Sequence, residues 1–267
     1  MSERLFSEEI TNGVVYDLGQ PFHPGMPRSS EAMPFLFWVT KKHSDKTLPD
    51  GFSASVEMFT STSHMGTHID ALGHVSLNGK LFGGELASAN QDRETGLKKL
   101  GIDAVPPLVT RGVLLDVAGL KQVEVLPPAY EITAADLEQA ATAAGKTINP
   151  GDAVFIRTGW SRYWADSSQY HSSAGCPGPA RQGAEWLANK GIRLTGSDTP
   201  MYEKGDRRPG LFHPVHLLLL VERGIHIVES MNLEPLVQAS VSSFVSVTIP
   251  LAIVGASGSP VRPIAIK

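Results

Sequence analysis

Strand-length apolar runs that alternate with helical segments constrain the fold of this 267-residue chain more than any other feature. After residue 110, each of these runs is followed by a stretch that carries helix start or turn signals. Such alternation is typical of α/β proteins, in which helices cover a sheet. The first hundred residues are strand-rich instead, so we expect an α/β fold with a mixed sheet. The apolar runs are residues 112–117, 153–158, 192–195, 225–229 and 244–249.

Helix and strand limits follow from capping residues and turn formers. Three helices are expected. A capping box marks the start of the first and a glycine its end, whereas each of the other two begins with a proline and is followed by a glycine. Two earlier runs alternate and are rich in aromatic and β-branched residues, as strands are. The expected helices are residues 133–145, 179–190 and 214–223, and the earlier strands are residues 35–41 and 55–62.

We expect one domain that extends over residues 1–267. Proline and glycine are scattered as turn residues, and no long linker, repeat or low-complexity segment divides the chain. Four prolines lie in residues 20–34, so residues 1–34 are expected to form an irregular N-terminal arm.

Composition excludes several classes of protein. The net charge is −4, with no basic run that would bind nucleic acid or an anionic membrane. The longest strictly apolar run, residues 217–221, is far too short to span a membrane. The N-terminus carries charges and no apolar signal region, and the single cysteine excludes an intramolecular disulfide. We therefore expect a cytoplasmic protein with neither nucleic-acid nor membrane partners.

Three histidines and an aspartate gather between His64 and His74. Imidazole nitrogens and carboxylate oxygens are the ligands that zinc and manganese accept. His64 and His68 are four residues apart, as in the HExxH zinc helix, but Met65 replaces the glutamate base. A helix would turn Asp70 roughly 200° away from His68, whereas an extended segment places them on one face. The cluster is therefore expected at a strand end or turn that follows residues 55–62.

A second group of candidate ligands lies in residues 213–229. On a helix, His213 and His216 are three apart and share a face, so either could point at the site. On the following strand, His226 and Glu229 face opposite sides, so only one of them points inward.

The string His64-x-Gly66-Thr67-His68-x-Asp70-x-x-x-His74 resembles the HxGTHxDxxxH signature of the cyclase family of metal-dependent amidohydrolases. That family includes bacterial kynurenine formamidases, isatin hydrolases and some lactamases. Every fixed position of the signature is present, although residues 71–73 lack the proline that often lies near the last histidine. Weaker similarity extends from about residue 14 to residue 254. The resemblance implies a swivelling β/β/α domain and a homo-oligomer, either a dimer or a tetramer.

The resemblance also implies roles for single residues. His64, His68 and Asp70 would hold the first metal ion, and His74 would lie just outside it as the general acid/base. His216 and Glu229 match the family's later histidine and glutamate best. Together these residues imply one or two divalent ions, zinc or manganese, per chain.

The chemistry of amide hydrolysis requires the same set of groups. A metal ion with an open coordination position lowers the pKa of its bound water to about 7 and polarises the carbonyl. The leaving nitrogen then needs a proton, which a histidine that is not a ligand can deliver. His74 is that spare histidine.

We therefore expect a metal-dependent hydrolase that opens a small cyclic amide or imide, such as isatin or a lactam. An arylformamidase that hydrolyses N-formylkynurenine is the close alternative. A non-catalytic, metal-dependent binding protein is the alternative from another class, and His74 argues against it because a binding module needs no proton donor. Whether Asp198, Phe35, Phe37 and Trp38 line the substrate pocket stays open at this stage.

Overall fold

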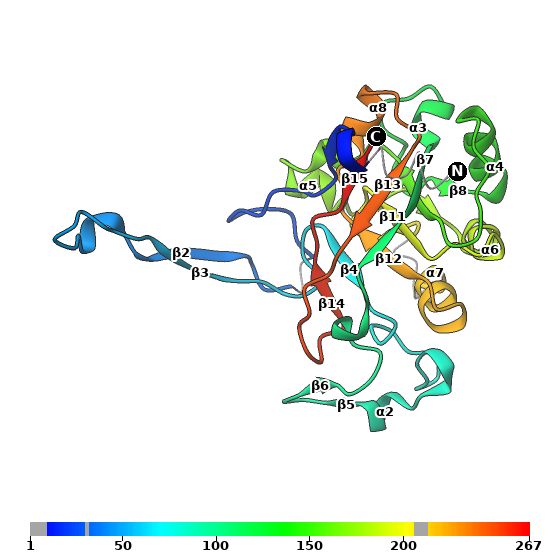
Figure 1. Cartoon of the computed structure of the whole chain (residues 1–267). Coiled ribbons are helices and arrows are strands. Elements are labelled where there is room, and N and C mark those ends of the chain that lie inside the picture. The colour runs from blue at the N-terminus through cyan, green and yellow to red at the C-terminus, as the bar shows by residue number, and fades with distance from the viewer. Residues whose placement is uncertain (1–9, 30–31, 206–212) are drawn as a thin grey trace.

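A nine-stranded mixed sheet forms the body of the protein in the computed structural model, which describes residues 10–29, 32–205 and 213–267 (Figure 1). The strand order is β1-β15-β13-β7-β9-β11-β12-β4-β14. The four central strands β7, β9, β11 and β12 are mutually parallel, and antiparallel strands flank them on both sides. The strands are β1 Val15–Asp17, β4 His68–Asp70, β7 Leu108–Asp116, β9 Ala153–Arg157, β11 Leu194–Ser197, β12 His226–Glu229, β13 Ser243–Thr248, β14 Gly258–Pro260 and β15 Ile264–Ile266. The expected α/β class and mixed sheet are confirmed.

Alternate residues of the central strands belong to two separate apolar cores, one on each side of the sheet. Val154 and Ile156 of β9 pack with residues of the helices α4, Ala134–Ala143, and α6, Arg181–Asn189, whereas Phe155 faces a core that includes Phe244. All five residues of β9 are buried, because parallel strands are covered on both faces. This burial explains why these strands are continuous apolar runs in the sequence.

The three expected helices are present. Thr133 and Asp136 form the capping box of α4, and α6 ends shortly before Gly191. The third helix differs from the expectation, because α7 is a single turn that continues as a π-helix, Leu217–Glu222. The π geometry is frequent at functional sites. The α-helices are α2 Ala87–Asn90, α3 Val117–Leu120, α4 Ala134–Ala143, α5 Ser167–Tyr170, α6 Arg181–Asn189, α7 Pro214–His216 and α8 Glu234–Gln238.

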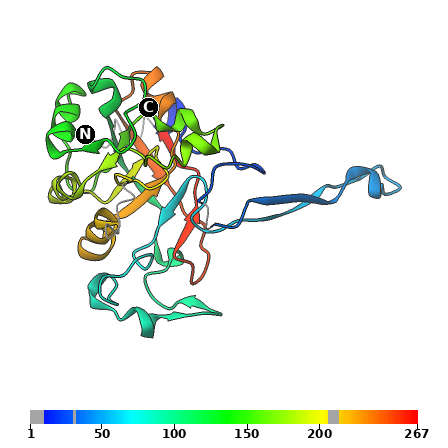
Figure 2. The same ribbon diagram turned by 180° about the vertical axis from the view of Figure 1, so that it is seen from behind.

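A hairpin of β2, Leu36–Lys41, and β3, Val56–Thr60, projects far from the body (Figures 1 and 2). Every residue of the two strands except Lys41 is exposed. These strands coincide with the expected runs at 35–41 and 55–62. The remaining strands form short pairs: β5 Gln91–Asp92 with β6 Gly96–Leu97, and β8 Glu131–Ile132 with β10 Gly178–Pro179.

Part of the N-terminal region joins the sheet. Within the first 34 residues, Val15–Asp17 form β1 and pair with β15, while residues 18–29 have no regular strand or helix. Residues 1–9 and 30–31 lie outside the described part of the chain. Across the described ranges, none of the helices has the length and apolar character needed to cross a membrane.

Candidate metal centre

The pairing of β4 with β12 brings the first ligand group next to the second. The strands run antiparallel, and Glu229 lies directly opposite His68 in the register. Opposed residues of paired strands present their side chains on the same face. Glu229 Oε2 accordingly lies 3.4 Å from His68 Nε2, which is 3.7 Å from Asp70 Oδ1.

His64 reaches the cluster through a turn rather than along an extended strand. Only His68–Asp70 form a strand, and His64 lies in the turn before it, as the expected position at a strand end or turn after residues 55–62 allows. Gly66 has a φ of +61°, a left-handed conformation that glycine adopts without strain. The turn places His64 Nδ1 2.8 Å from Asp70 Oδ1, and Nε2 lies 2.9 Å from the hydroxyl of Ser257.

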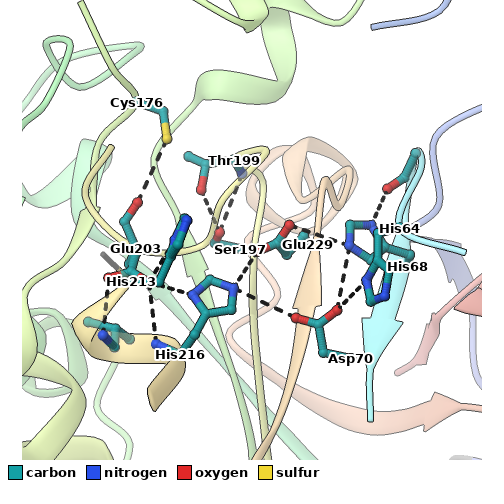
Figure 3. Close-up of polar contacts among 12 residues, drawn as sticks. His64, His68, Asp70, Cys176, Ser197, Thr199, Glu203, His213, His216 and Glu229 are labelled. Carbon is teal, nitrogen blue, oxygen red and sulfur yellow. Dashed lines mark hydrogen bonds and ion pairs between the residues drawn. The ribbon is translucent and has the colours of Figure 1, made fainter. Parts of the chain in front are cut away.

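His216 enters the cluster from α7 (Figure 3). Its Nε2 lies 3.1 Å from Glu229 Oε1 and 3.7 Å from Asp70 Oδ2. The ring is buried, and hydrogen bonds to Glu203 and Glu229 raise the pKa of His216 although burial alone would lower it. His216 and Glu229, which lie far from residue 70 in the sequence, thus meet the first ligand group at Asp70.

Asp70 is the shared member of the cluster. Burial alone would raise the pKa of its carboxyl, but the neighbouring His74, His64 and His68 hold that pKa well below its usual range. Oδ2 is buried and has no hydrogen-bond partner among the described residues. An ionised, unpaired oxygen in a buried position is costly unless a cation or a donor satisfies it. The donor set and this unpaired oxygen fit a divalent metal ion.

His74 stacks on His64, with ring centroids 3.9 Å apart and an interplanar angle of 25°. Burial lowers the pKa of His74 to about 4, so its imidazole is neutral at pH 7. Within the described part of the chain, its ring nitrogens make no hydrogen bond. A ring nitrogen of His74 nevertheless lies within 4.8 Å of ligand atoms of His64 and Asp70, so the geometry allows either an acid/base or a ligand role.

Sequence reasoning missed Glu203. This buried carboxylate lies 2.5 Å from His216 Nδ1, on the side of the ring that faces away from Asp70 (Figure 3). Glu203 and the exposed His213 form a further cluster of possible ligands with His216. Burial alone would raise the pKa of Glu203, but hydrogen bonds from His213 and His216 lower it to about 2. Its loop carries no periodic pattern, so only the tertiary contact identifies it.

Of the aromatic residues considered as pocket residues, Phe35 and Phe37 line a cavity and Trp38 does not. Phe35 and Phe37, with Phe22 and Phe59, line an open, mainly apolar cavity of about 890 Å³ at the base of the β2–β3 hairpin. Trp38 is absent from that lining and is 43% exposed. A separate cavity of about 50 Å³ is lined by the cluster histidines His64 and His68 and by Arg28, Tyr170 and Ser230, among others.

Asp198 lies outside both of these cavities. It is fully buried and accepts hydrogen bonds from the backbone and hydroxyl of Thr158 and from the backbone of Gly159. Burial raises the pKa of its carboxyl to about 6. Asp198 therefore joins the ends of β9 and β11.

Known proteins are similar to this chain in sequence and in fold. Residues 16–204 match the family "Cyclase". "Cyclase-like protein 2" from Arabidopsis thaliana is 27% identical over 97% of this chain and 81% of its own length. A "Kynurenine formamidase" from Bacillus cereus is 26% identical over 93% of this chain and 95% of its own length.

Solved structures agree. The structure of "a novel cyclase" superposes with a TM-score of 0.88 at 27% identity and covers 100% of this chain and 92% of its own. "Isatin hydrolase A" from Ralstonia solanacearum superposes with a TM-score of 0.74 at 23% identity, and the match covers 98% of this chain and 95% of that chain. The family match covers more than half of the chain and the whole signature from His64 to His74. The chain belongs to the cyclase family.

Proposed function

We propose that this protein is a metal-dependent hydrolase that opens a small cyclic amide or imide, such as isatin or a lactam. The convergence on Asp70 carries the proposal: two histidines from one side and a histidine–glutamate pair from the other approach one buried carboxylate. A solved relative named as an isatin hydrolase supports this substrate class. The swivelling β/β/α arrangement of one domain over residues 1–267 is part of the same proposal.

In this proposal, His64, His68, Asp70, His216 and Glu229 hold one or two zinc or manganese ions. Asp70 supports a two-ion arrangement, because its Oδ1 faces His64 and its Oδ2 faces His216. When bound, such an ion would activate water and polarise the amide carbonyl.

His74 is the proposed general acid/base. Its neutral ring stacks on His64 at the edge of the ligand cluster, so it is able to accept a proton from the attacking water. The protonated ring then lies beside the negative charge of Asp70 and passes the proton to the leaving nitrogen. A small cavity lies beside His64 and His68, and Tyr170 and Ser230 form part of its wall.

The test combines metal analysis with a substrate panel. We expect protein purified without chelator to contain one or two equivalents of zinc or manganese by mass spectrometry. The metal-loaded protein should hydrolyse isatin or a γ-lactam faster than N-formylkynurenine, and dialysis against chelator should abolish turnover. Metal-free protein whose melting temperature does not respond to added zinc or manganese would overturn the proposal.

An arylformamidase is the second candidate, and the kynurenine formamidase relative from Bacillus cereus favours it. Preferred hydrolysis of N-formylkynurenine in the same panel would establish this activity instead. Metal binding without turnover of any of the three compounds would identify a binding protein.

We also propose that the chain forms a homo-oligomer through the β2–β3 hairpin. Trp38 and Met58 face each other on one side of the hairpin, and Phe37 and Phe59 face each other on the other. All four side chains are 43–67% exposed, although an isolated two-stranded hairpin is only marginally stable in water. Apolar side chains on both faces favour a hairpin that a second copy covers.

A further inference from the structure

We propose that Glu203 is a positioning residue, which fixes the ring orientation and the tautomer of His216 and thereby determines metal affinity on the His216–Glu229 side of the cluster. The inference deepens the proposed function and rests on its metal centre. Glu203 contacts the side of the His216 ring that faces away from Asp70 and Glu229 (Figure 3).

The contacts of the Glu203 carboxylate select one tautomer of His216. Oε1 lies 2.5 Å from His216 Nδ1 and also accepts the backbone N–H of His216 at 3.3 Å, while Oε2 accepts the backbone N–H of Val215 at 3.0 Å. An ionised carboxylate only accepts hydrogen bonds, so Nδ1 must carry the proton. Nε2 faces Asp70 and Glu229, so a metal ion bound there would replace the proton of Nε2 and take up its lone pair.

The fold fixes Glu203 as firmly as it fixes the ligands. The backbone N–H groups of Lys204 and Gly205 donate to the carbonyls of Pro179 and Cys176. A Cβ atom at Gly178 would lie only 2.3 Å from the carbonyl oxygen of Tyr202, so the two segments are in direct backbone contact. Glu203 itself is only 3% exposed. The carboxylate therefore has a defined position before any metal arrives.

The three histidines proposed as ligands, His64, His68 and His216, differ in the group that contacts the ring nitrogen facing away from the metal site. Ser257 offers a neutral hydroxyl to His64, and Gly66 offers a neutral carbonyl to His68. His216 has a charged partner, and a hydrogen bond to a carboxylate is roughly twice as strong as one between neutral groups. Carboxylate partners of this kind also increase the basicity of the ligand nitrogen. We therefore expect the metal affinity of His216 to depend more on its neighbour, Glu203, than that of His64 or His68 depends on theirs.

The first experiment removes the negative charge of Glu203 and keeps the shape of its side chain. Glu203→Gln should weaken zinc or manganese binding by about 10–100-fold, measured by competition with a chelator of known affinity. Glu131→Gln is the matched control. Glu131 is an exposed carboxylate that forms an ion pair with Lys204, the residue directly after Glu203. The control should bind metal as wild type does. Wild-type affinity in Glu203→Gln would overturn the inference.

The second experiment separates positioning from a structural role, since Glu203 also accepts the first backbone N–H groups of α7. In a His216→Ala background, Glu203→Gln should cause no further loss of metal affinity, because the ring that it positions is gone. An equal loss in both backgrounds would mean that Glu203 acts only on the fold, and a matching fall in the melting temperature of the metal-free protein would accompany it.

Different results would overturn the proposed metal-dependent hydrolase and the proposed role of Glu203. Wild-type protein that binds neither zinc nor manganese would overturn the metal-dependent hydrolase together with this inference. Wild-type protein that binds metal and hydrolyses amides, with unchanged affinity in Glu203→Gln, would overturn only the role of Glu203.

Discussion

At the scale of single residues, one buried carboxylate organises the candidate site. Asp70 is 1% exposed, yet its two oxygens face different histidines, His64 at 2.8 Å and His216 at 3.7 Å. A buried carboxylate between imidazoles is stable only while positive charge lies next to it. Metal ions would supply that charge and leave the imidazoles neutral.

The first prediction concerns His74, whose neutral ring makes no hydrogen bond within the described ranges. His74→Ala should lower kcat by roughly 10²–10⁴-fold, the usual effect of a lost general acid/base, and should keep metal content near that of wild type. Steady-state kinetics and metal analysis on one preparation check both. His68→Ala is the comparison and should lose metal and activity together. Loss of metal in His74→Ala would instead make His74 a ligand, as its distance to His64 and Asp70 allows.

The second prediction concerns Glu229, which contacts both His68 and His216. If two ions are bound, Glu229→Gln should halve the metal count, because a neutral amide is a much poorer ligand than a carboxylate. The metal-to-protein ratio after gel filtration measures this directly. Unchanged metal content with activity reduced by about 10–100-fold would make Glu229 an orienting group. Unchanged content and activity would remove it from the site.

At the scale of elements, register and one turn bring the ligands together. The antiparallel pairing of β4 with β12 sets His68 opposite Glu229, so a shift of one residue would turn one of the two side chains to the opposite face. The turn before β4 then brings His64 back towards Asp70. Gly66 allows this turn, and a Cβ atom there would lie 2.4 Å from the ring of Phe22.

Gly66→Ala is the third prediction. The left-handed φ alone costs about 1–2 kcal/mol for a residue with a Cβ atom, and the contact with Phe22 adds a packing cost of about 1–3 kcal/mol. Gly79→Ala isolates the first cost, because Gly79 has a φ of +73° and a Cβ atom there would meet no heavy atom within 4 Å. Chemical denaturation should show a larger loss of stability for Gly66→Ala than for Gly79→Ala. Equal losses would mean that the ring of Phe22 moves aside freely.

At the scale of the whole molecule, the exposed β2–β3 hairpin is the feature on which the proposed homo-oligomer depends. Exposed aromatic side chains such as Trp38, Phe37 and Phe59 would each bury roughly 100 Å² in an interface. These three side chains would thus supply roughly 300 Å² of the roughly 800 Å² that each partner of a stable interface buries, and other residues of the hairpin and of the apolar cavity at its base would supply the rest. The same chain thus offers both an apolar projection and an apolar cavity.

Trp38→Lys is the fourth prediction. A charge on this face of the hairpin should shift the protein from an oligomer towards a 28.6 kDa monomer, because burying an unpaired ammonium group is costly. Light scattering after gel filtration gives the mass. Val123→Lys changes an exposed valine that follows α3 and is not part of the hairpin, and it should leave the mass as it is in wild type. A wild-type protein that is monomeric at micromolar concentration would contradict the role of the hairpin.

The sequence by itself determined the central strands, the helices α4 and α6 and one half of the candidate site. Buried parallel strands must be apolar on both faces, so β7, β9 and β12 were evident as short apolar runs. The capping box of Thr133 and the signature from His64 to His74 are local patterns, and local patterns are legible in a single chain.

Only the tertiary structure decided how the two halves meet. The register of β4 against β12 sets which side chains converge on Asp70, and strand pairing over more than 150 residues has no local signal in the sequence. Glu203 is the clearest case, because its loop has no periodicity and its role depends on backbone contacts with the Cys176–Pro179 segment. A residue that acts through a distant partner becomes recognisable only when the fold places that partner beside it.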